Sequence, residues 1–191
     1  RIQKGDPRYK LVYTLAKLIA MEGIDVVTGG GPGLMDAANR GHHVGRKSNG
    51  THSIGLTITL PKEQYASKHL DIKKNYNRFS GRLDKFMEIS NAVVVAPGGI
   101  GTALEFFYTW QLVQVKHICD TPIILLGEMW IDLLKWVRTS MVRKKLVSKE
   151  DLNSIFVAKN LREAMKIITE THALFKSGGK DVCVNIKKYV K

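Results

Sequence analysis

The 191 residues are enough for one sizeable domain with a single core, and 44% hydrophobic and 25% charged residues are ordinary for a globular protein. No apolar run approaches the roughly 20 residues that span a bilayer, and residues 1–10 lack the apolar core of a signal peptide, so a membrane-spanning or secreted protein is not expected. The two cysteines, Cys119 and Cys183, stand in neither a metal-binding nor a CxxC spacing, which favours a reducing, cytoplasmic compartment.

The formal charge of +13 suits an anionic partner, but its distribution weakens that interpretation. Residues 135–191 carry 14 basic and 5 acidic side chains, whereas residues 1–134 carry 16 and 12. No RNA- or DNA-binding signature accompanies the C-terminal excess. We therefore interpret the charge mainly as a solvated basic surface, with a nucleic-acid partner as the less favoured alternative.

Helical periodicity and short apolar runs alternate along the chain. They predict, in order, helix 9–21, strand 24–28, helix 34–46, strand 53–60, helix 81–90, strand 92–96, helix 102–117, strand 122–126, helix 130–145, strand 154–158 and helix 160–170. Residues 62–79 are polar and basic, and we expect a loop there that carries a short strand near residues 70–74.

The predicted strands are continuously apolar, which is typical of a parallel sheet covered by helices on both faces. The expected fold is therefore α/β, a single domain with one doubly wound parallel sheet, in which strands 24–28, 53–60, 92–96 and 122–126 are neighbours. Such a domain usually opens on a strand, whereas this chain opens on a helix, which is consistent with a first strand that precedes residue 1.

Two glycine clusters, GGGPG at 29–33 and PGGIG at 97–101, each follow a predicted strand and precede a helix. Ligands of parallel α/β sheets bind at this edge, where glycines let a ligand touch the backbone and helix N–H groups attract an anion. Thr102 adds a hydroxyl donor. Together the loops predict one pocket for a phosphate-bearing ligand, with tight βα turns as the alternative. Neither completes a P-loop or GxGxxG, so spacing leaves nucleotide and sugar phosphate open.

Glu105 is expected in the first turn of helix 102–117, and Arg82 at the start of helix 81–90. A carboxylate beside a phosphate site suits a base, or the stabilisation of positive charge that develops on a sugar, and Arg82 is the matching cation. The alternatives are a simple helix-dipole carboxylate and a surface arginine. His42 and His43 are adjacent on a predicted helix, so they point in different directions, and both are expected at the surface.

The stretches GGGPGLMDAANRG (29–41) and GRLDKFMEISNAVVVAPGGIGTALE (81–105) resemble the LOG ("Lonely Guy") family of cytokinin riboside 5′-monophosphate phosphoribohydrolases, whose members often carry the label lysine decarboxylase. The family pattern is GGGxxGLM followed by PGGxGTxxE, with an arginine fifteen residues before the PGG proline, and Arg82 stands fifteen before Pro97. This resemblance implies a Rossmann-like fold, a homodimer or larger assembly, and hydrolysis of a nucleoside 5′-monophosphate (AMP or a cytokinin-type nucleotide) to free base and ribose 5-phosphate, with no metal or other cofactor.

The match to these motifs gives Arg82 and Glu105 the catalytic positions. It implies substrate- and phosphate-binding positions at Gly30, Gly31, Gly33, Met35, Gly98, Gly99, Gly101 and Thr102. No lysine stands in a setting that marks a pyridoxal phosphate Schiff base, so decarboxylation is not supported. Molybdenum-cofactor carriers, which are similar in fold and glycine loops, bind without turnover and form the alternative class. Residues 1–170 are the expected nucleotide-binding domain and 171–191 a basic extension.

Overall fold

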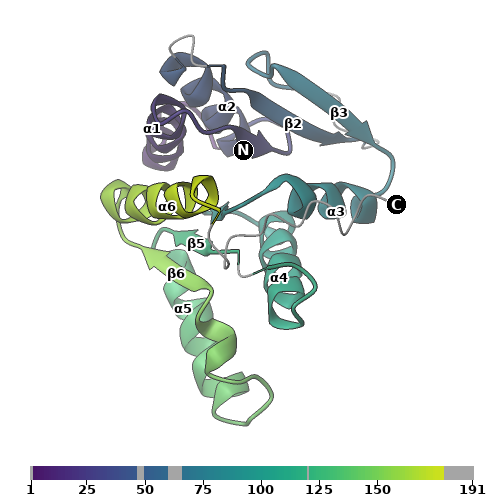
Figure 1. The fold of residues 1–191 in the computed structure, drawn as a ribbon, viewed down its shortest axis with the longest axis vertical. Coiled ribbons are helices and arrows are strands. Elements are labelled where there is room, and N and C mark those ends of the chain that lie inside the picture. The colour runs from purple at the N-terminus through teal and green to yellow at the C-terminus, as the bar shows by residue number, and fades with distance from the viewer. Residues whose placement is uncertain (1, 47–49, 60–65, 120, 179–191) are drawn as a thin grey trace. The chain divides into compact units, whose positions relative to one another are not determined.

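The structure is a computed structural model that describes residues 2–46, 50–59, 66–119 and 121–178. It divides into two compact units, Arg1–Ser90 and Asn91–Lys191. Each unit holds its own three-stranded sheet, in which every pair of neighbouring strands is parallel. The two sheets and their helices are drawn in Figure 1.

The first unit alternates helices with strands. It contains α1 (Pro7–Met21), β1 (Val26–Thr28), α2 (Leu34–Gly45), β2 (Ser53–Ile58), β3 (Ile72–Tyr76) and α3 (Phe79–Ile89), with the sheet order β1-β2-β3. α1 begins after Asp6, whose carboxylate accepts a hydrogen bond from the Arg8 N–H at 2.8 Å, and Pro7 occupies the first helical position.

Helices α1 and α2 pack backbone against backbone at two glycines four residues apart. A Cβ atom on Gly41 would collide with the Tyr13 carbonyl oxygen, and one on Gly45 would collide with that of Lys17. Both glycines are buried. The absence of a side chain at Gly41 and Gly45 lets the two helices approach closely. This close approach also buries His42, the residue that follows Gly41.

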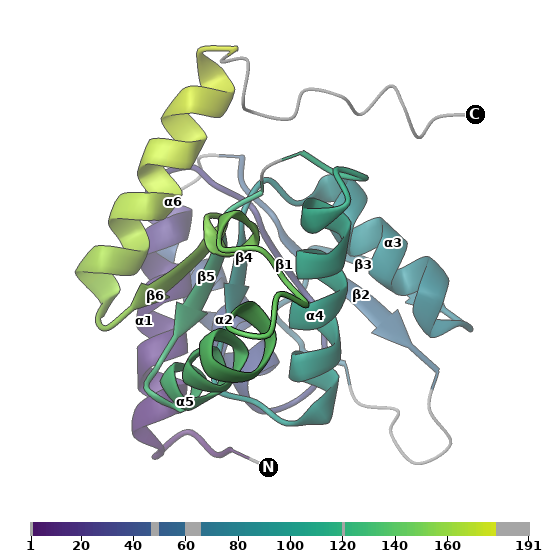
Figure 2. The ribbon, with the colours of Figure 1, turned by 90° about the horizontal axis from the view of Figure 1, so that it is seen from below.

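The second unit has the sheet order β4-β5-β6, and Figure 2 shows β5 between its two neighbours. Its elements are β4 (Val93–Val95), α4 (Ile100–Gln114), β5 (Ile123–Leu126), α5 (Met129–Trp136), the π-helical turn η1 (Val137–Val142), the 3₁₀ turn η2 (Glu150–Leu152), β6 (Ile155–Ala158) and α6 (Leu161–Lys176). The core is aromatic: the Phe106 ring centroid lies 5.7 Å from that of Trp110 and 6.0 Å from that of Trp130.

The predicted α/β class, with parallel strands joined mostly by helices, is confirmed, and so is the short strand expected near residues 70–74. The expected pairings of 24–28 with 53–60 and of 92–96 with 122–126 are also found. Several helix boundaries differ from the prediction. The helix predicted over 130–145 is α-helical only to Trp136 and continues as η1, and α6 runs past residue 170 to Lys176. Residues 179–191 of the predicted extension lie outside the described residues.

Within the part of the chain that the structure describes, no helix is long and apolar enough to cross a membrane.

Candidate active site

The first glycine loop leaves β1 and is held by hydrogen bonds to its own unit. Gly30 has φ +69, a conformation that favours glycine. Its N–H donates to Thr28 Oγ1 at 3.0 Å, and its carbonyl oxygen accepts from the Ser67 N–H at 2.8 Å. Gly30 therefore shapes the turn, and its N–H and carbonyl oxygen are both engaged within the protein.

A network of hydrogen bonds between polar side chains supports this loop. Thr28 Oγ1 donates to Asn39 Oδ1 at 2.8 Å. On the other side Ser67 Oγ donates to Asp36 Oδ1 at 2.8 Å, and the Tyr9 hydroxyl donates to Asp36 Oδ2 at 3.0 Å. Sequence analysis missed all of these supporting residues, because only their three-dimensional partners distinguish them from ordinary polar positions. They give the loop one defined shape.

Arg82 of α3 lies against the same loop. Its side chain is only 7% exposed, and its Nε donates to the Leu56 carbonyl oxygen of β2 at 2.6 Å. The Arg82 Cζ atom lies 5.1 Å from the centroid of the Phe86 ring. A Cβ atom on Gly29 would collide with Arg82 Nη2. Glycine at position 29 thus makes room for the guanidinium, and Arg82 is not the surface arginine of the alternative interpretation.

Met35 and two further predicted glycines complete this half of the site. A Cβ atom on Gly29 would lie 2.7 Å from Met35 Sδ, and one on Gly31 would lie 2.7 Å from Met35 Cε, so this side chain extends over the loop. Gly33, with φ +77, is the N-cap of α2 and provides no side-chain hydrogen bond there. The first unit therefore brings Gly31, Gly33, Met35 and Arg82 to one loop.

The second glycine loop joins β4 to α4. A Cβ atom on Gly98 would collide with Thr102 Oγ1, so the threonine hydroxyl is directed back at the loop. Around Gly99 and Gly101 a Cβ atom would meet nothing within 4 Å, and both residues are exposed. Gly99 caps α4 without a side-chain hydrogen bond, and the first N–H groups of an α-helix have no partner within the helix. An anion could be bound here.

Glu105 lies one turn further along α4 than predicted. The helix begins at Ile100 rather than at 102, which places Glu105 in the second turn, and the first turn holds no acidic residue. The effect of the helix dipole falls off within the first turn, so it stabilises this carboxylate less than we expected. The side chain is half-buried, and the Glu105 carbonyl oxygen accepts from Thr109 Oγ1 at 2.8 Å.

The prediction that both adjacent histidines lie at the surface is half wrong. His43 is exposed, but His42 is completely buried, with its Nε2 at 3.0 Å from the Ile24 carbonyl oxygen. Burial lowers the pKa of His42 below its ordinary value, because the charged imidazolium loses its solvation there. The physical reason is the close crossing of α1 and α2 at Gly41, which leaves no solvent around the next residue.

The candidate residues fall into two sets, each built within its own unit. Arg82, Met35 and the first loop belong to Arg1–Ser90, whereas the second loop, Thr102 and Glu105 belong to Asn91–Lys191. Each set follows a parallel strand and offers the start of a helix with no side-chain cap. Such a pair of strand-to-helix glycine loops is typical of Rossmann-like α/β proteins.

The chain belongs to the LOG-like family whose model is described as "Possible lysine decarboxylase", which matches residues 35–168. This agrees with the resemblance seen in the two glycine motifs. Among curated proteins, the chain is 29% identical over 132 residues to the pyrimidine/purine nucleotide 5′-monophosphate nucleosidase of Escherichia coli strain K12. The match covers 64% of this chain but only 28% of that enzyme, so the chain spans less than a third of the length of this relative.

Solved structures share the fold over most of the chain. The molybdenum cofactor binding protein of Rippkaea orientalis superposes with a TM-score of 0.64 at 22% identity, covering 86% of this chain and 88% of that one. The molybdenum cofactor carrier protein of Chlamydomonas reinhardtii gives 0.63 at 22% identity, covering 90% and 91%. A single solved chain thus matches residues of both units, and at this identity the likeness establishes the fold alone.

Proposed function

We propose that the protein hydrolyses the N-glycosidic bond of a nucleoside 5′-monophosphate and releases the free base and ribose 5-phosphate. AMP, or a modified adenine nucleotide of the cytokinin type, is the substrate class that the family resemblance favours. The observation that carries the proposal is the buried Arg82 guanidinium against Gly29, in a chain related to nucleotide 5′-monophosphate nucleosidases.

The phosphate group is assigned to the second glycine loop. Gly99 and Gly101 are exposed and have open space around them, and the Thr102 hydroxyl is directed back at Gly98. Backbone N–H groups at a helix start, together with a hydroxyl, are a common arrangement for phosphate oxygens. In this proposal Gly98 is required because any side chain there would displace Thr102.

Glu105 is assigned to the reacting sugar. Cleavage moves the electron pair of the C1′–N bond onto the base, and the oxygen of a water molecule forms the new bond to C1′. The departing base takes up one proton and the water loses one. The transition state has oxocarbenium character, which a fixed carboxylate stabilises electrostatically, and the same group can orient the water.

Arg82 is assigned to substrate binding through phosphate or ribose oxygens, for which a planar guanidinium is well suited. Its Nε is already used by the Leu56 carbonyl oxygen, which fixes the side chain in one orientation. Gly31, Gly33 and Met35 are assigned to substrate binding beside Arg82 in the first unit, while Gly30 holds the loop in shape. This chemistry assigns no role to a metal, and among the described residues no group of three or more histidine, cysteine or acidic side chains could hold one.

The competing function is that of a carrier that binds a nucleotide or pterin phosphate without cleaving it. Solved molybdenum-cofactor carriers share the fold, but they do so at 22% identity. Arg82 and Glu105 favour the enzyme. The test is to incubate the protein with a panel of nucleoside 5′-monophosphates and to score free base by chromatography. Release of adenine from AMP supports the proposal, whereas binding of every nucleotide without base release supports the carrier.

We also propose that the protein works as a homodimer or larger homo-oligomer. Helix α4 buries Phe106, Trp110 and Val113, yet it also exposes Ile100, Leu104 and Phe107, which recur at helical spacing on another side. A second copy of the chain would cover this stripe. The compartment proposed is the cytoplasm, and this now rests on the proposed nucleotide substrate alone. Cys119 is disulfide-bonded, so the cysteines do not support the reducing compartment that we expected from their spacing.

A further inference from the structure

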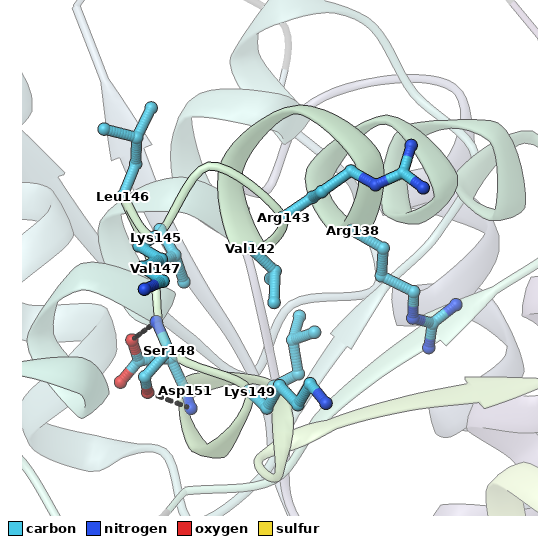
Figure 3. Close-up of a pocket in the computed structure, with 10 residues that line it drawn as sticks. Arg138, Val142, Arg143, Lys145, Leu146, Val147, Ser148, Lys149 and Asp151 are labelled. Atoms are coloured by element: carbon cyan, nitrogen blue, oxygen red, sulfur yellow. Dashed lines mark hydrogen bonds between the residues drawn. The ribbon is translucent and has the colours of Figure 1, made fainter.

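A concave site lies in the unit Asn91–Lys191, where η1 is followed by the segment that leads to η2. It has a volume of about 1000 Å³, and four of its lining side chains are cationic: Arg138, Arg143, Lys145 and Lys149. Figure 3 shows Val142 pointing into this space, which we call the basic groove, with Arg138 and Lys149 extending toward one side of it.

The basic groove is separate from the glycine loop of its own unit. Its floor is attached to the C-terminal end of α4, where Gln114 Nε2 donates to Asp151 Oδ2 at 3.0 Å. Trp110 Nε1 also donates to the Asp151 carbonyl oxygen, at 2.8 Å. The PGGIG loop lies at the other end of this 15-residue helix, which corresponds to roughly 20 Å.

The carboxylate in the groove is already engaged and leaves the cations uncompensated. Asp151 Oδ2 accepts from the Ser148 N–H at 2.8 Å as well as from Gln114. Burial raises the pKa of Asp151, but these hydrogen bonds and the nearby Lys116 outweigh it and hold the pKa below its ordinary value. Asp151 forms an ion pair with none of these four cationic side chains. Among the described residues, no carboxylate lies within ion-pair distance of them.

Lys145 is placed in the groove at a conformational cost. The Lys145 N–H donates to the Val142 carbonyl oxygen at 2.9 Å, and the Leu146 N–H donates to that of Met141 at 2.9 Å. This is the helix-ending motif that normally has glycine at the position of Lys145, whose φ is +59. A charged side chain therefore occupies a position where the backbone favours glycine. For this reason the substitution Lys145→Gly removes the charge without destabilising the fold.

Apart from Ser148 and Asp151, the rest of the lining is aliphatic and consists of Val142, Leu146, Val147 and Leu152. Among the described residues no aromatic side chain lines the groove, so this lining offers the bases of a single-stranded nucleic acid nothing to stack on. A ligand that matches both features has an apolar group at its centre and negative charges around it. An aliphatic side chain flanked by aspartate or glutamate is such a ligand.

Neither residues 179–191 nor a second copy of these 191 residues is a favourable source of this segment. Residues 179–191 carry four lysines and one aspartate, and a second copy of the chain carries the same net charge of +13. Both would be repelled by the groove. We propose that the basic groove binds an acidic segment of another protein, with an aliphatic side chain of the partner between Val142 and Leu152 and carboxylates on Arg138, Arg143, Lys145 and Lys149.

The test uses the full-length protein and a short fluorescein-labelled peptide with a central leucine flanked by glutamates, followed by fluorescence anisotropy. Arg138→Gln with Arg143→Gln should weaken binding by about tenfold. The matched control, Lys159→Gln with Arg162→Gln, removes the same charge from residues of the same unit that do not line the groove, and should leave binding within about twofold. Lys145→Gly should also weaken binding, while thermal unfolding shows equal or greater stability.

Two further probes identify the ligand. A peptide with serine in place of the leucine should bind several-fold more weakly, because the aliphatic floor then has no partner. Inorganic tripolyphosphate and single-stranded RNA should compete only weakly with the labelled peptide. The proposal is overturned if the protein does not bind the peptide, if both double variants weaken binding equally, if the serine peptide binds as well, or if RNA or tripolyphosphate binds more tightly than the peptide. None of these outcomes depends on the proposed hydrolase activity.

Discussion

The guanidinium of Arg82 occupies the space that a side chain on Gly29 would need. Gly29 does not have a positive φ, so alanine would fit its backbone conformation, and the substitution acts on Arg82 and Met35 rather than on the main chain. We predict that Gly29→Ala displaces the guanidinium and lowers kcat/KM for AMP by about 10- to 100-fold, since small displacements in a site are costly. Steady-state kinetics of base release measures this.

The double variant tests whether the effect passes through Arg82. In an Arg82→Ala background, adding Gly29→Ala should change kcat/KM by less than about twofold, because the guanidinium is gone and the flexible Met35 thioether can rotate away from the new methyl group. Gly81→Ala is the control, since its Cβ atom would meet only Tyr76 Cδ1, at 3.9 Å. Full additivity of the Gly29 and Arg82 substitutions would show that Gly29 acts by another route.

The crossing of α1 and α2 at Gly41 and Gly45 should be intolerant of any side chain. We predict that Gly41→Ala lowers the free energy of unfolding by about 1–3 kcal/mol, because its Cβ atom meets the backbone of Tyr13, which cannot rotate away. Urea denaturation measures the change. Gly81→Ala, at an open helical position, should instead be neutral or stabilising. Equal stability of Gly41→Ala and the parent would contradict this packing.

Much of the architecture could be predicted from the sequence. Buried parallel strands have uninterrupted apolar runs, such as IILL in β5, and a glycine cluster follows β1 and β4. The start of α4 could not. We expected Ile100 and Gly101 to belong to the PGGIG loop, but α4 begins at Ile100 without a side-chain cap. Glu105 therefore lies in the second turn of the helix and not in the first. The burial of His42 also escaped prediction, since it depends on Gly41 meeting α1, a contact between helices that periodicity does not encode.

His42 should make stability depend on pH. Burial lowers its folded pKa below the ordinary 6.5, so the imidazole is neutral in the native state. The unfolded chain therefore binds more protons as pH falls through and below 6.5, and the stability present above this pH is lost on acidification. We predict that the free energy of unfolding falls from about pH 7.5 to about pH 5.5.

Two adjacent variants isolate this contribution. His42→Gln should flatten the dependence in urea titrations at several pH values. His43→Gln, which alters the neighbouring exposed ring, should leave the dependence nearly unchanged. If the two variants give the same pH profile as the parent, the burial of His42 does not control it.

The exposed stripe of α4 should hold copies of the chain together. Leu104 and Phe107 are 46% and 37% exposed, so charged residues there should disturb an interface more than the fold. We predict that Leu104→Glu with Phe107→Glu produces a monomer in light scattering at micromolar concentration. Leu174→Glu on α6, at an apolar position that is 54% exposed, should leave the assembly intact. A parental protein that is itself monomeric would contradict the proposal.

The most direct test of the proposed hydrolysis is the rate of base release by Glu105→Gln. The change keeps the shape of the side chain and removes its charge. If the carboxylate acts mainly on the oxocarbenium-like transition state, kcat for AMP should fall by about 10²- to 10³-fold while AMP binding, measured by calorimetry, changes little. Arg82→Ala should lower affinity and rate together. A Glu105→Gln protein that releases adenine at the parental rate would contradict the account and leave Glu105 without a role in catalysis.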